Sequence, residues 1–233
     1  MTEHVNQLGQ PIGFPLSHWT ARPRPPRTAT EGRFCTVEPI VPARHAAELH
    51  AAYLLDKEGR NWTYLPYGPF LVFEDYHAHL ERNCLGDDPL VHAIIHRGSG
   101  RAVGVASLMR IDPAPGVIEV GGINYAPPLQ RTPAATEAMY LIMRRVFDEL
   151  GYRRYEWKCD ALNAASRRAA LRLGFRFEGI FREHMIIKGR NRDTAWFAML
   201  AADWPARKAV FERWLAPQNF NPDGTQRERL GEA

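Results

Sequence analysis

Hydrophobic and polar positions follow two different periods along this chain, and the two periods alternate. Seven segments predict β-strands: apolar and polar residues alternate at 32–38, 90–97 and 101–112, residues 117–125 are β-branched and apolar-rich, and residues 155–159, 176–187 and 194–200 are further strands. Apolar residues recur every three or four positions at residues 133–150, and residues 43–55, 73–83, 163–173 and the segment from 203 onward are the other predicted helices. This order predicts an α+β (α/β) domain in which helices lie on both faces of a mixed sheet.

The segment 117–174 has the clearest internal boundaries. Its first strand is rich in β-branched residues, and the adjacent Gly121 and Gly122 predict a bulge or a close backbone approach. Thr132 is a good N-cap and Pro133 suits the first helical position, so a helix is expected to begin there. The segment therefore predicts a strand, a long helix, a second strand and a short helix.

The chain divides into three parts. Residues 1–30 contain Pro, Gly and Arg without periodicity and predict an extended arm, which Trp19 attaches to the domain. Residues 31–204 contain the periodic segments and form the expected domain. Residues 205–233 are expected to form a C-terminal helix and a loose, polar tail.

Composition narrows the class of protein. The chain has 233 residues, of which 45% are hydrophobic, and this is enough for one sizeable domain with extensions. A net charge of +4 suits an anionic ligand but is well short of the usual excess in nucleic-acid-binding proteins. No apolar run approaches the ~20 residues that cross a bilayer. Three scattered cysteines without metal-ligand spacing indicate a reducing, cytoplasmic location. Neither membrane nor nucleic acid is expected as a partner, and nothing indicates the oligomeric state.

Two motifs carry a family resemblance. In the first, a strand ends in an apolar triplet, x-Pro-x-Φ follows, and Gln/Arg-x-x-Gly-x-Gly/Ala opens a helix; the matching residues are Ile123, Asn124, Tyr125, Pro127, Leu129, Gln130 and Ala135. The second is Asn163-x-x-Ser166, followed by Leu173-Gly174-Phe175-x-Phe177-Glu178-Gly179. Together they resemble the GNAT superfamily of acyl-coenzyme A N-acyltransferases, and within it the ribosomal-protein-serine/alanine N-acetyltransferase branch. The resemblance covers roughly residues 33–204 and implies a GNAT-like, mostly antiparallel central sheet.

The resemblance implies that acetyl-CoA is the co-substrate. The start of the long helix would hold its pyrophosphate, and backbone N–H groups near residues 123–125 would polarise the thioester oxygen. One departure is Pro133, which stands where the signature has its first Gly and lacks an N–H. We expect free amides at the next three residues to compensate. The cofactor contacts are expected at Ile123, Asn124, Tyr125, Gln130, Arg131, Thr132, Ala134, Ala135, Thr136 and Asn163.

Amide formation from a thioester needs a neutral amine and a proton for the leaving thiolate. The resemblance assigns that proton to Ser166. The base stays open, because the branch carries it at the position of Met185 in this chain. Glu119, on the strand that leads to the thioester, and His184, whose imidazole can accept a proton, are the candidates. Deprotonation through water is the alternative.

Residues 61–70 form an aromatic loop stiffened by proline. The loop either packs on the core as an Ω-loop or lines the acceptor pocket, and we favour pocket lining by Trp62, Tyr64 and Tyr67. Its aromatic, non-acidic character argues against polycationic antibiotics as acceptors.

The sequence therefore predicts an acetyl-CoA-dependent N-acetyltransferase that acts on a primary amine, either a protein N-terminus or a small amine. The alternative is a non-catalytic, ribosome- or RNA-associated module on the same fold, with the basic arm as its contact. That module would show salt-sensitive RNA affinity and no turnover.

Overall fold

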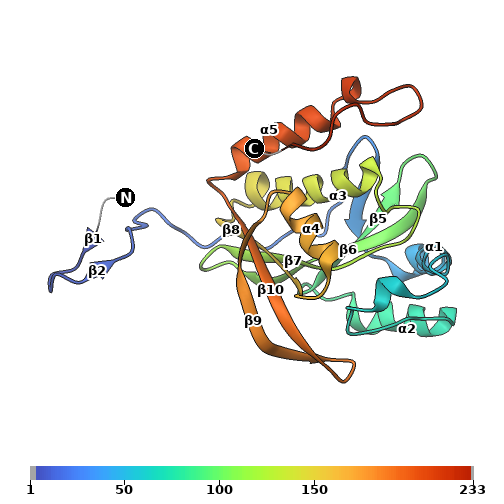
Figure 1. Ribbon diagram of the computed structural model, residues 1–233, viewed down its shortest axis with the longest axis horizontal. Coiled ribbons are helices and arrows are strands. Elements are labelled where there is room, and N and C mark those ends of the chain that lie inside the picture. The colour runs from blue at the N-terminus through green and yellow to red at the C-terminus, as the bar shows by residue number, and fades with distance from the viewer. Residues whose placement is uncertain (1–3, 232–233) are drawn as a thin grey trace.

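The computed structural model describes residues 4–231, and an eight-stranded sheet forms its centre (Figure 1). The strands of this sheet are β3 (Thr30–Glu31), β4 (Cys35–Pro39), β5 (Leu90–His96), β6 (Arg101–Asp112), β7 (Val117–Tyr125), β8 (Arg154–Asp160), β9 (Arg176–Ile187) and β10 (Arg190–Leu200). Their spatial order is β3-β4-β5-β6-β7-β8-β10-β9, and every neighbouring pair is antiparallel except β7 and β8. The prediction of a mixed, mostly antiparallel sheet is confirmed.

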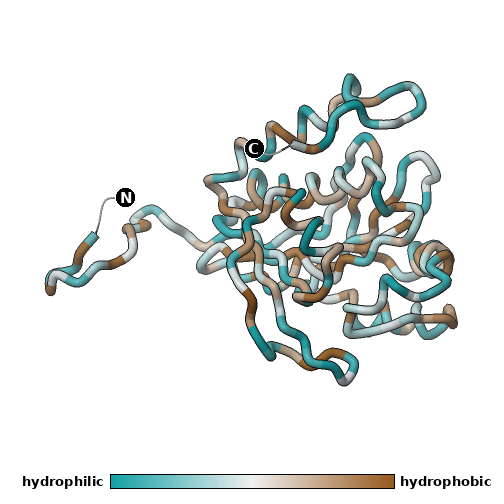
Figure 2. Tube along the Cα trace, viewed as in Figure 1, coloured by the Kyte–Doolittle hydropathy of each residue, from teal (hydrophilic) through white to brown (hydrophobic). Residues whose placement is uncertain are grey.

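Helices cover both faces of the sheet, as predicted. They are α1 (Pro42–Tyr53), the 3₁₀ turn η1 (Arg60–Trp62), α2 (Phe73–Asn83), α3 (Pro133–Arg144), the π turn η2 (Arg145–Glu149), α4 (Ala164–Arg172), α5 (Trp204–Leu215) and the 3₁₀ turn η3 (Pro217–Asn219). In Figure 1, α1 and α2 lie on one side of the sheet, and α3, α4 and α5 lie on the other. Two hydrophobic clusters fill these interfaces, and Figure 2 shows brown stretches alternating with pale and teal ones through the domain.

Strands β7 and β8 separate partway along their length. They pair only from Val117 to Val120, and beyond that point β7 pairs with β6 alone. Gly121 and Gly122 mark this point: Gly122 has a φ of +57°, and a side chain at Gly121 would collide with the Met109 sulfur. The pairing of β7 with β6 shifts register between Gly121 and Asn124, so of the two sequence predictions the bulge is confirmed. The atoms nearest to both glycines belong to side chains, so the close backbone approach is not.

A buried carboxylate joins the start of the sheet to α3. Glu137 accepts hydrogen bonds from the backbone N–H groups of Arg33 (2.8 Å), Phe34 (2.6 Å) and Cys35 (2.8 Å). Gly32 precedes them, and any side chain there would overlap the carboxylate. The turn before β4 is therefore held on α3 by one side chain.

The N-terminal arm projects from the domain (Figure 1). It contains a short hairpin of β1 (His4–Val5) and β2 (Pro11–Ile12), which the extended arm expected from the sequence did not include. Trp19 attaches the arm, as predicted, because its Nε1 donates to the Ala114 carbonyl at 2.7 Å.

The prediction of a loose tail after α5 is wrong for the described residues. Trp214 Nε1 donates to the Glu228 carbonyl at 3.0 Å, and the Glu228 N–H donates to Asn219 Oδ1 at 2.8 Å. The Asn219 amide nitrogen in turn donates to the Trp214 carbonyl. Since Trp214 itself belongs to the core, these bonds hold the tail on the domain.

The β9–β10 hairpin turns earlier than the sequence indicated. We expected its second strand from residue 194, but β10 begins at Arg190. Lys188 and Gly189 both have positive φ (49° and 72°), which makes a two-residue turn and lets the polar residues after it pair as a strand.

Across residues 4–231, no helix is long and apolar enough to span a membrane. The cysteines at positions 35, 84 and 159 are all buried free thiols.

His92 gives the fold a pH dependence. It is buried in β5, and burial together with the nearby Arg145 lowers its pKa to about 4. The unfolded chain, with a pKa of about 6.5, therefore binds the proton more readily, so stability is complete above that pH and is lost as the pH falls toward 4. Between pH 7 and pH 5, we expect urea unfolding to show that the wild-type protein loses about 2 kcal/mol more than His92→Gln. The same substitution at the exposed His18 is the control, and an equal pH dependence in all three proteins would contradict the prediction.

Candidate functional site

A cavity of about 670 Å³ opens where β7 and β8 separate. Strands β6, β7 and β8 form its base, and α2, the 61–70 loop, the start of α4 and the β9–β10 hairpin form its walls. Eight of the predicted site residues line it: Trp62, Tyr64, Tyr67, Glu119, Ile123, Asn124, Asn163 and Ser166. The cavity therefore brings the predicted acceptor, thioester and proton-donor residues together.

Ser166 lies in the wall at the start of α4. Asn163 caps this helix, because its Oδ1 accepts the Ser166 N–H at 3.0 Å. Trp157 Nε1 donates to Ser166 Oγ at 2.9 Å. The hydroxyl oxygen is thus used as an acceptor, and its own proton can be donated into the cavity.

Glu119 also lines the cavity, but two cations hold its carboxylate. Arg110 Nη1 lies 2.7 Å and Lys158 Nζ lies 2.8 Å from Oε2 of Glu119, whose side chain is 3% exposed. Lys158 also lies 2.7 Å from the buried Glu156 carboxylate. Glu119 is thus one member of an ion-pair network along the sheet.

His184 does not line the cavity, although its neighbour Met185 does. The His184 ring packs against Phe181 and Trp196, and its Nδ1 lies 2.9 Å from Thr194 Oγ1. The structure therefore separates the two predicted bases.

The aromatic loop both packs on the core and lines the cavity. Trp62 is buried and packs edge-on against Tyr53 and Phe70, as in a structural loop, yet it also lines the cavity. Burial raises the pKa of Tyr67 to about 12, so its hydroxyl stays protonated at neutral pH. Tyr64 donates its hydroxyl to the Leu162 carbonyl at 3.3 Å.

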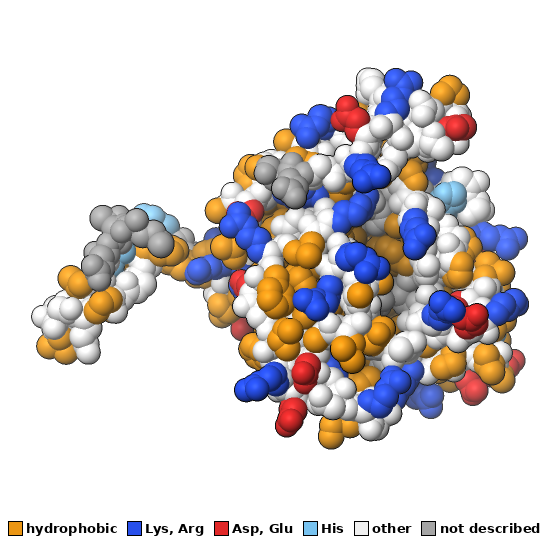
Figure 3. All heavy atoms as spheres, in the orientation of Figure 1, with side chains coloured by type: hydrophobic (Ala, Val, Ile, Leu, Met, Phe, Trp, Pro, Cys, Tyr) orange, Lys and Arg blue, Asp and Glu red, His pale blue; other side chains and the backbone are white. Residues whose placement is uncertain are grey.

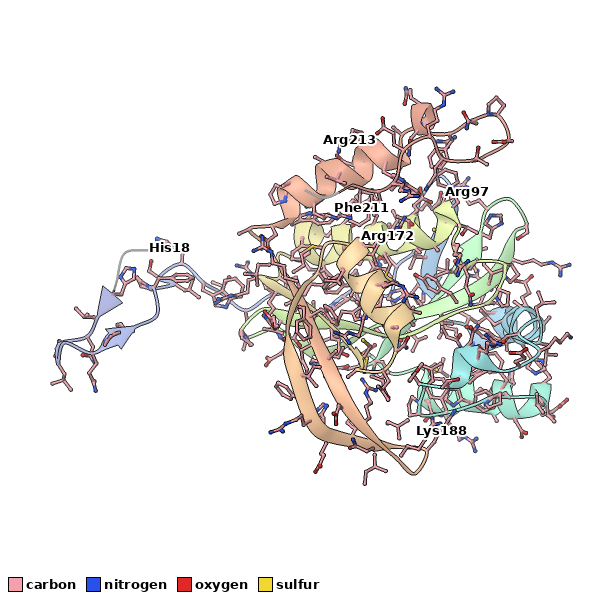
Figure 4. All side chains as sticks on the ribbon, viewed as in Figure 1. His18, Arg97, Arg172, Lys188, Phe211 and Arg213 are labelled. Atoms are coloured by element: carbon pink, nitrogen blue, oxygen red, sulfur yellow. The ribbon has the colours of Figure 1, made fainter. Side chains whose placement is uncertain are left out.

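The β9–β10 hairpin holds this loop in place. Lys188, labelled in Figure 4, donates from Nζ to the Trp62 carbonyl at 2.8 Å. Arg190 donates from Nη2 to the Thr63 carbonyl at 2.7 Å. Two elements far apart in the sequence thus meet over the cavity.

The start of α3 has the predicted capping. Thr132 Oγ1 accepts the Ala135 N–H at 3.2 Å, and Pro133 occupies the first helical position. The expectation of three free amides is therefore wrong, because the cap itself uses the Ala135 N–H.

The loop before α3 is fixed by other predicted residues. Gln130 Nε2 donates to the Tyr125 carbonyl (2.7 Å) and to Asn61 Oδ1 (2.9 Å), and Arg131 has a φ of +60°. None of the residues from Gln130 to Thr136 lines the cavity. The expected pyrophosphate site and the cavity are therefore separate parts of the site.

Basic side chains surround the helix ends near the expected cofactor site. On the face seen in Figure 3, Lys and Arg side chains gather around a hollow beside α4. Arg172, labelled in Figure 4, donates from α4 to Thr136 Oγ1 in the first turn of α3 at 3.1 Å. This charge suits an anionic ligand at the start of α3.

Four charged residues that were not predicted from the sequence also line the cavity: Arg110, Lys158, Asp160 and Arg192. A signal for two of them was present, because Glu156, Lys158 and Asp160 alternate along β8 and lie on one face of a central strand. Charged residues on a central strand are costly to bury unless that face meets a polar cavity.

A mixed sheet that opens between two central strands, with a capped helix beside the opening and a hydroxyl within it, fits an acyl-CoA-dependent acyltransferase. The sequence model of the Acetyltransferase (GNAT) domain matches residues 35–176. The chain therefore belongs to the GNAT acetyltransferase family, and acetyl-CoA is its co-substrate.

Solved structures agree with this family. A GCN5-related N-acetyltransferase from Brucella melitensis is 50% identical over 92% of this chain and 97% of its own, with a TM-score of 0.90. A GNAT-family protein from Chromobacterium violaceum is 38% identical over 84% of this chain and 98% of its own, with a TM-score of 0.78. No curated protein sequence matches the chain.

Two more distant structures share only the fold. The microcin C7 self-immunity acetyltransferase MccE is 21% identical over 72% of this chain and 93% of its own, with a TM-score of 0.63. The ribosomal-protein-S5-alanine acetyltransferase from Vibrio fischeri is 17% identical over 76% of this chain and 98% of its own, with a TM-score of 0.59. The resemblance to the ribosomal-protein branch is therefore distant.

Proposed function

We propose that the protein transfers the acetyl group of acetyl-CoA to a primary amine, either a protein N-terminus or a small amine, by direct attack on the thioester. The observation that carries this proposal is the single cavity that joins Ser166, the separated part of β7 and the aromatic loop. The crystal structure of MccE with acetyl-CoA and AMP supports the choice of acyl donor, because MccE has the same fold.

In the proposed reaction, the amine nitrogen bonds to the acetyl carbon and the carbon–sulfur bond breaks. Backbone N–H groups of β7 beyond Val120 polarise the carbonyl oxygen, and the start of α3 holds the pyrophosphate. Ser166 donates its hydroxyl proton to the leaving thiolate. A base takes one proton from the ammonium before attack, and the proton released by nitrogen after attack returns through water to Ser166.

We propose that one of three residues acts as the base. Glu119 lies in the cavity, but it would act as a base only by weakening its pairing with Arg110 or Lys158. His184 lies outside the cavity lining and would need an intervening water. Asp160 lines the cavity, and no cation lies within 4.0 Å of its carboxylate in the part of the chain that the structure describes.

The alternative of an RNA-associated module is not favoured by the arm. Arg22 stacks on Trp19, with its Cζ 4.2 Å from the ring centroid, and Arg27 pairs with Asp87 at 2.9 Å. Part of the positive charge of the arm is thus used within the chain.

Thiol release from acetyl-CoA, measured against N-terminal peptides, amino acids and polyamines, tests the proposal. We expect turnover with one acceptor class above the rate of acetyl-CoA hydrolysis without acceptor. Acetyl-CoA binding without turnover, combined with salt-sensitive RNA binding, would support the alternative module. A protein that does not bind acetyl-CoA would contradict the proposal.

A further inference from the structure

The charged residues in the cavity divide into paired and unpaired groups. Arg110, Glu119, Lys158 and Glu156 are joined in one ion-pair network of two cations and two carboxylates, so their charges cancel. Asp160 and Arg192 have no ion-pair partner within 4.0 Å among residues 4–231. The cavity therefore contains one unpaired negative and one unpaired positive side chain.

Arg192 is held in place by its inner nitrogen. Its Nε donates to Thr194 Oγ1 at 3.1 Å, and its side chain is half-buried in the cavity wall. The outer nitrogens, Nη1 and Nη2, have no hydrogen-bond partner within the described chain. A guanidinium in this position presents two parallel donors, the arrangement that binds a carboxylate or a phosphate.

Asp160 lies on the neighbouring strand, β8. It stands opposite Thr194 in the β8–β10 pairing and precedes Asn163 and Ser166 by a few residues. Its Oδ1 accepts the Leu162 N–H at 2.8 Å, which leaves Oδ2 for another donor. Arg192 lies two residues beyond Thr194 toward the hairpin turn, a separation of about 7 Å along a strand.

The acyl donor does not account for the anion site at Arg192. Its pyrophosphate is expected at the start of α3, and none of the residues from Gln130 to Thr136 lines the cavity that contains Arg192. Met185 and Ile187 of the β9–β10 hairpin line the same cavity, and Lys188 of that hairpin donates to the Trp62 carbonyl in the aromatic loop, so we assign this end of the cavity to the acceptor.

We propose that the acceptor is zwitterionic: a primary amine that also carries a carboxylate or phosphate group, with the anion bound by Arg192 and the ammonium facing Asp160. This inference rests on the proposed function and names its substrate class.

Matched acceptor pairs test the proposal. Free L-phenylalanine is compared with L-phenylalaninamide, and phosphoethanolamine with ethanolamine, by kcat/KM for acetyl transfer. We expect the wild-type protein to prefer an anionic member at least about tenfold, and Arg192→Met to reduce that preference about 10- to 100-fold, as a lost charge-assisted bidentate contact would. The kcat/KM for the neutral member should change less than about threefold. Arg182→Met, which removes an exposed charge from β9, is the control and should keep the preference.

A binding measurement separates this proposal from the proposed function. If no amine is acetylated, the proposed function fails. In that case the binding of N-acetyl-L-phenylalanine and of its amide is measured by tryptophan fluorescence, in the wild-type protein and in Arg192→Met. This measurement shows whether Arg192 binds an anion. Tighter binding of the acid that is lost in Arg192→Met supports the site. Equal use or binding of acid and amide by the wild-type protein, or an equal loss for both in Arg192→Met, would overturn it.

Discussion

Replacing Ser166 by Ala is expected to lower kcat about 100-fold, within the range that general acid catalysis contributes. The hydroxyl lies in the cavity wall, and its oxygen already accepts the indole N–H of Trp157 at 2.9 Å, so its proton is available to the departing sulfur. The dissociation constant for acetyl-CoA should change less than about threefold, because the proton matters only as the carbon–sulfur bond breaks. Steady-state kinetics and equilibrium binding of acetyl-CoA check both values.

Two further variants distinguish proton donation from lost structure. Ser166→Thr keeps a hydroxyl and should retain most of the activity. Trp157→Phe removes the indole donor but leaves the serine, so it should reduce kcat less than about tenfold. If Trp157→Phe were as inactive as Ser166→Ala, loss of the hydrogen bond between Trp157 and Ser166, rather than loss of the hydroxyl proton, would explain the reduced kcat.

Replacing Thr132 by Asp should weaken acetyl-CoA binding at least about 30-fold. Thr132 caps α3, and Asp at an N-cap would preserve the bond from the Ala135 N–H while adding a negative charge. Two like charges about 4 Å apart near a protein surface repel by up to about 4 kcal/mol, so the pyrophosphate would be repelled. Isothermal titration with acetyl-CoA measures the effect.

Thr132→Asn is the matched control, because Asn caps equally well and is uncharged. It should bind acetyl-CoA within about threefold of wild type. Thr132→Asp should not unfold more easily than Thr132→Asn, since a negative charge stabilises a helix start. Equal affinities for Thr132→Asp and Thr132→Asn would place the pyrophosphate elsewhere.

Most of the fold could be predicted from residue periodicity and helix caps. Thr132 and Pro133 marked the start of α3 because capping depends on a few neighbouring residues. The position of the β9–β10 turn was harder to predict, because the polar residues after Gly189 resemble a loop in sequence and form a strand only by pairing with β9. The tail was predicted to be loose for a similar reason: its bonds depend on Trp214, which lies in an earlier element.

Site residues could be predicted where their contacts lie within one short sequence motif. Asn163 and Ser166 are three residues apart on one helix turn, so their hydrogen bond was within reach of the sequence. The pairing of Glu119 with Arg110 and Lys158 depends on three strands that meet only in the folded sheet. The charges that define the acceptor end of the cavity arise from the same long-range pairing, so they were missed.

The contact between Glu137 and the turn before β4 has a consequence for how the chain folds as it is made. The carboxylate lies 102 to 104 residues after the three amides that it binds. At a synthesis rate of about 5 to 20 residues per second, the Glu137 carboxylate is made roughly 5 to 20 s after the turn that it binds. The N-terminal edge of the sheet is therefore completed late during translation, only after α3 has left the ribosome.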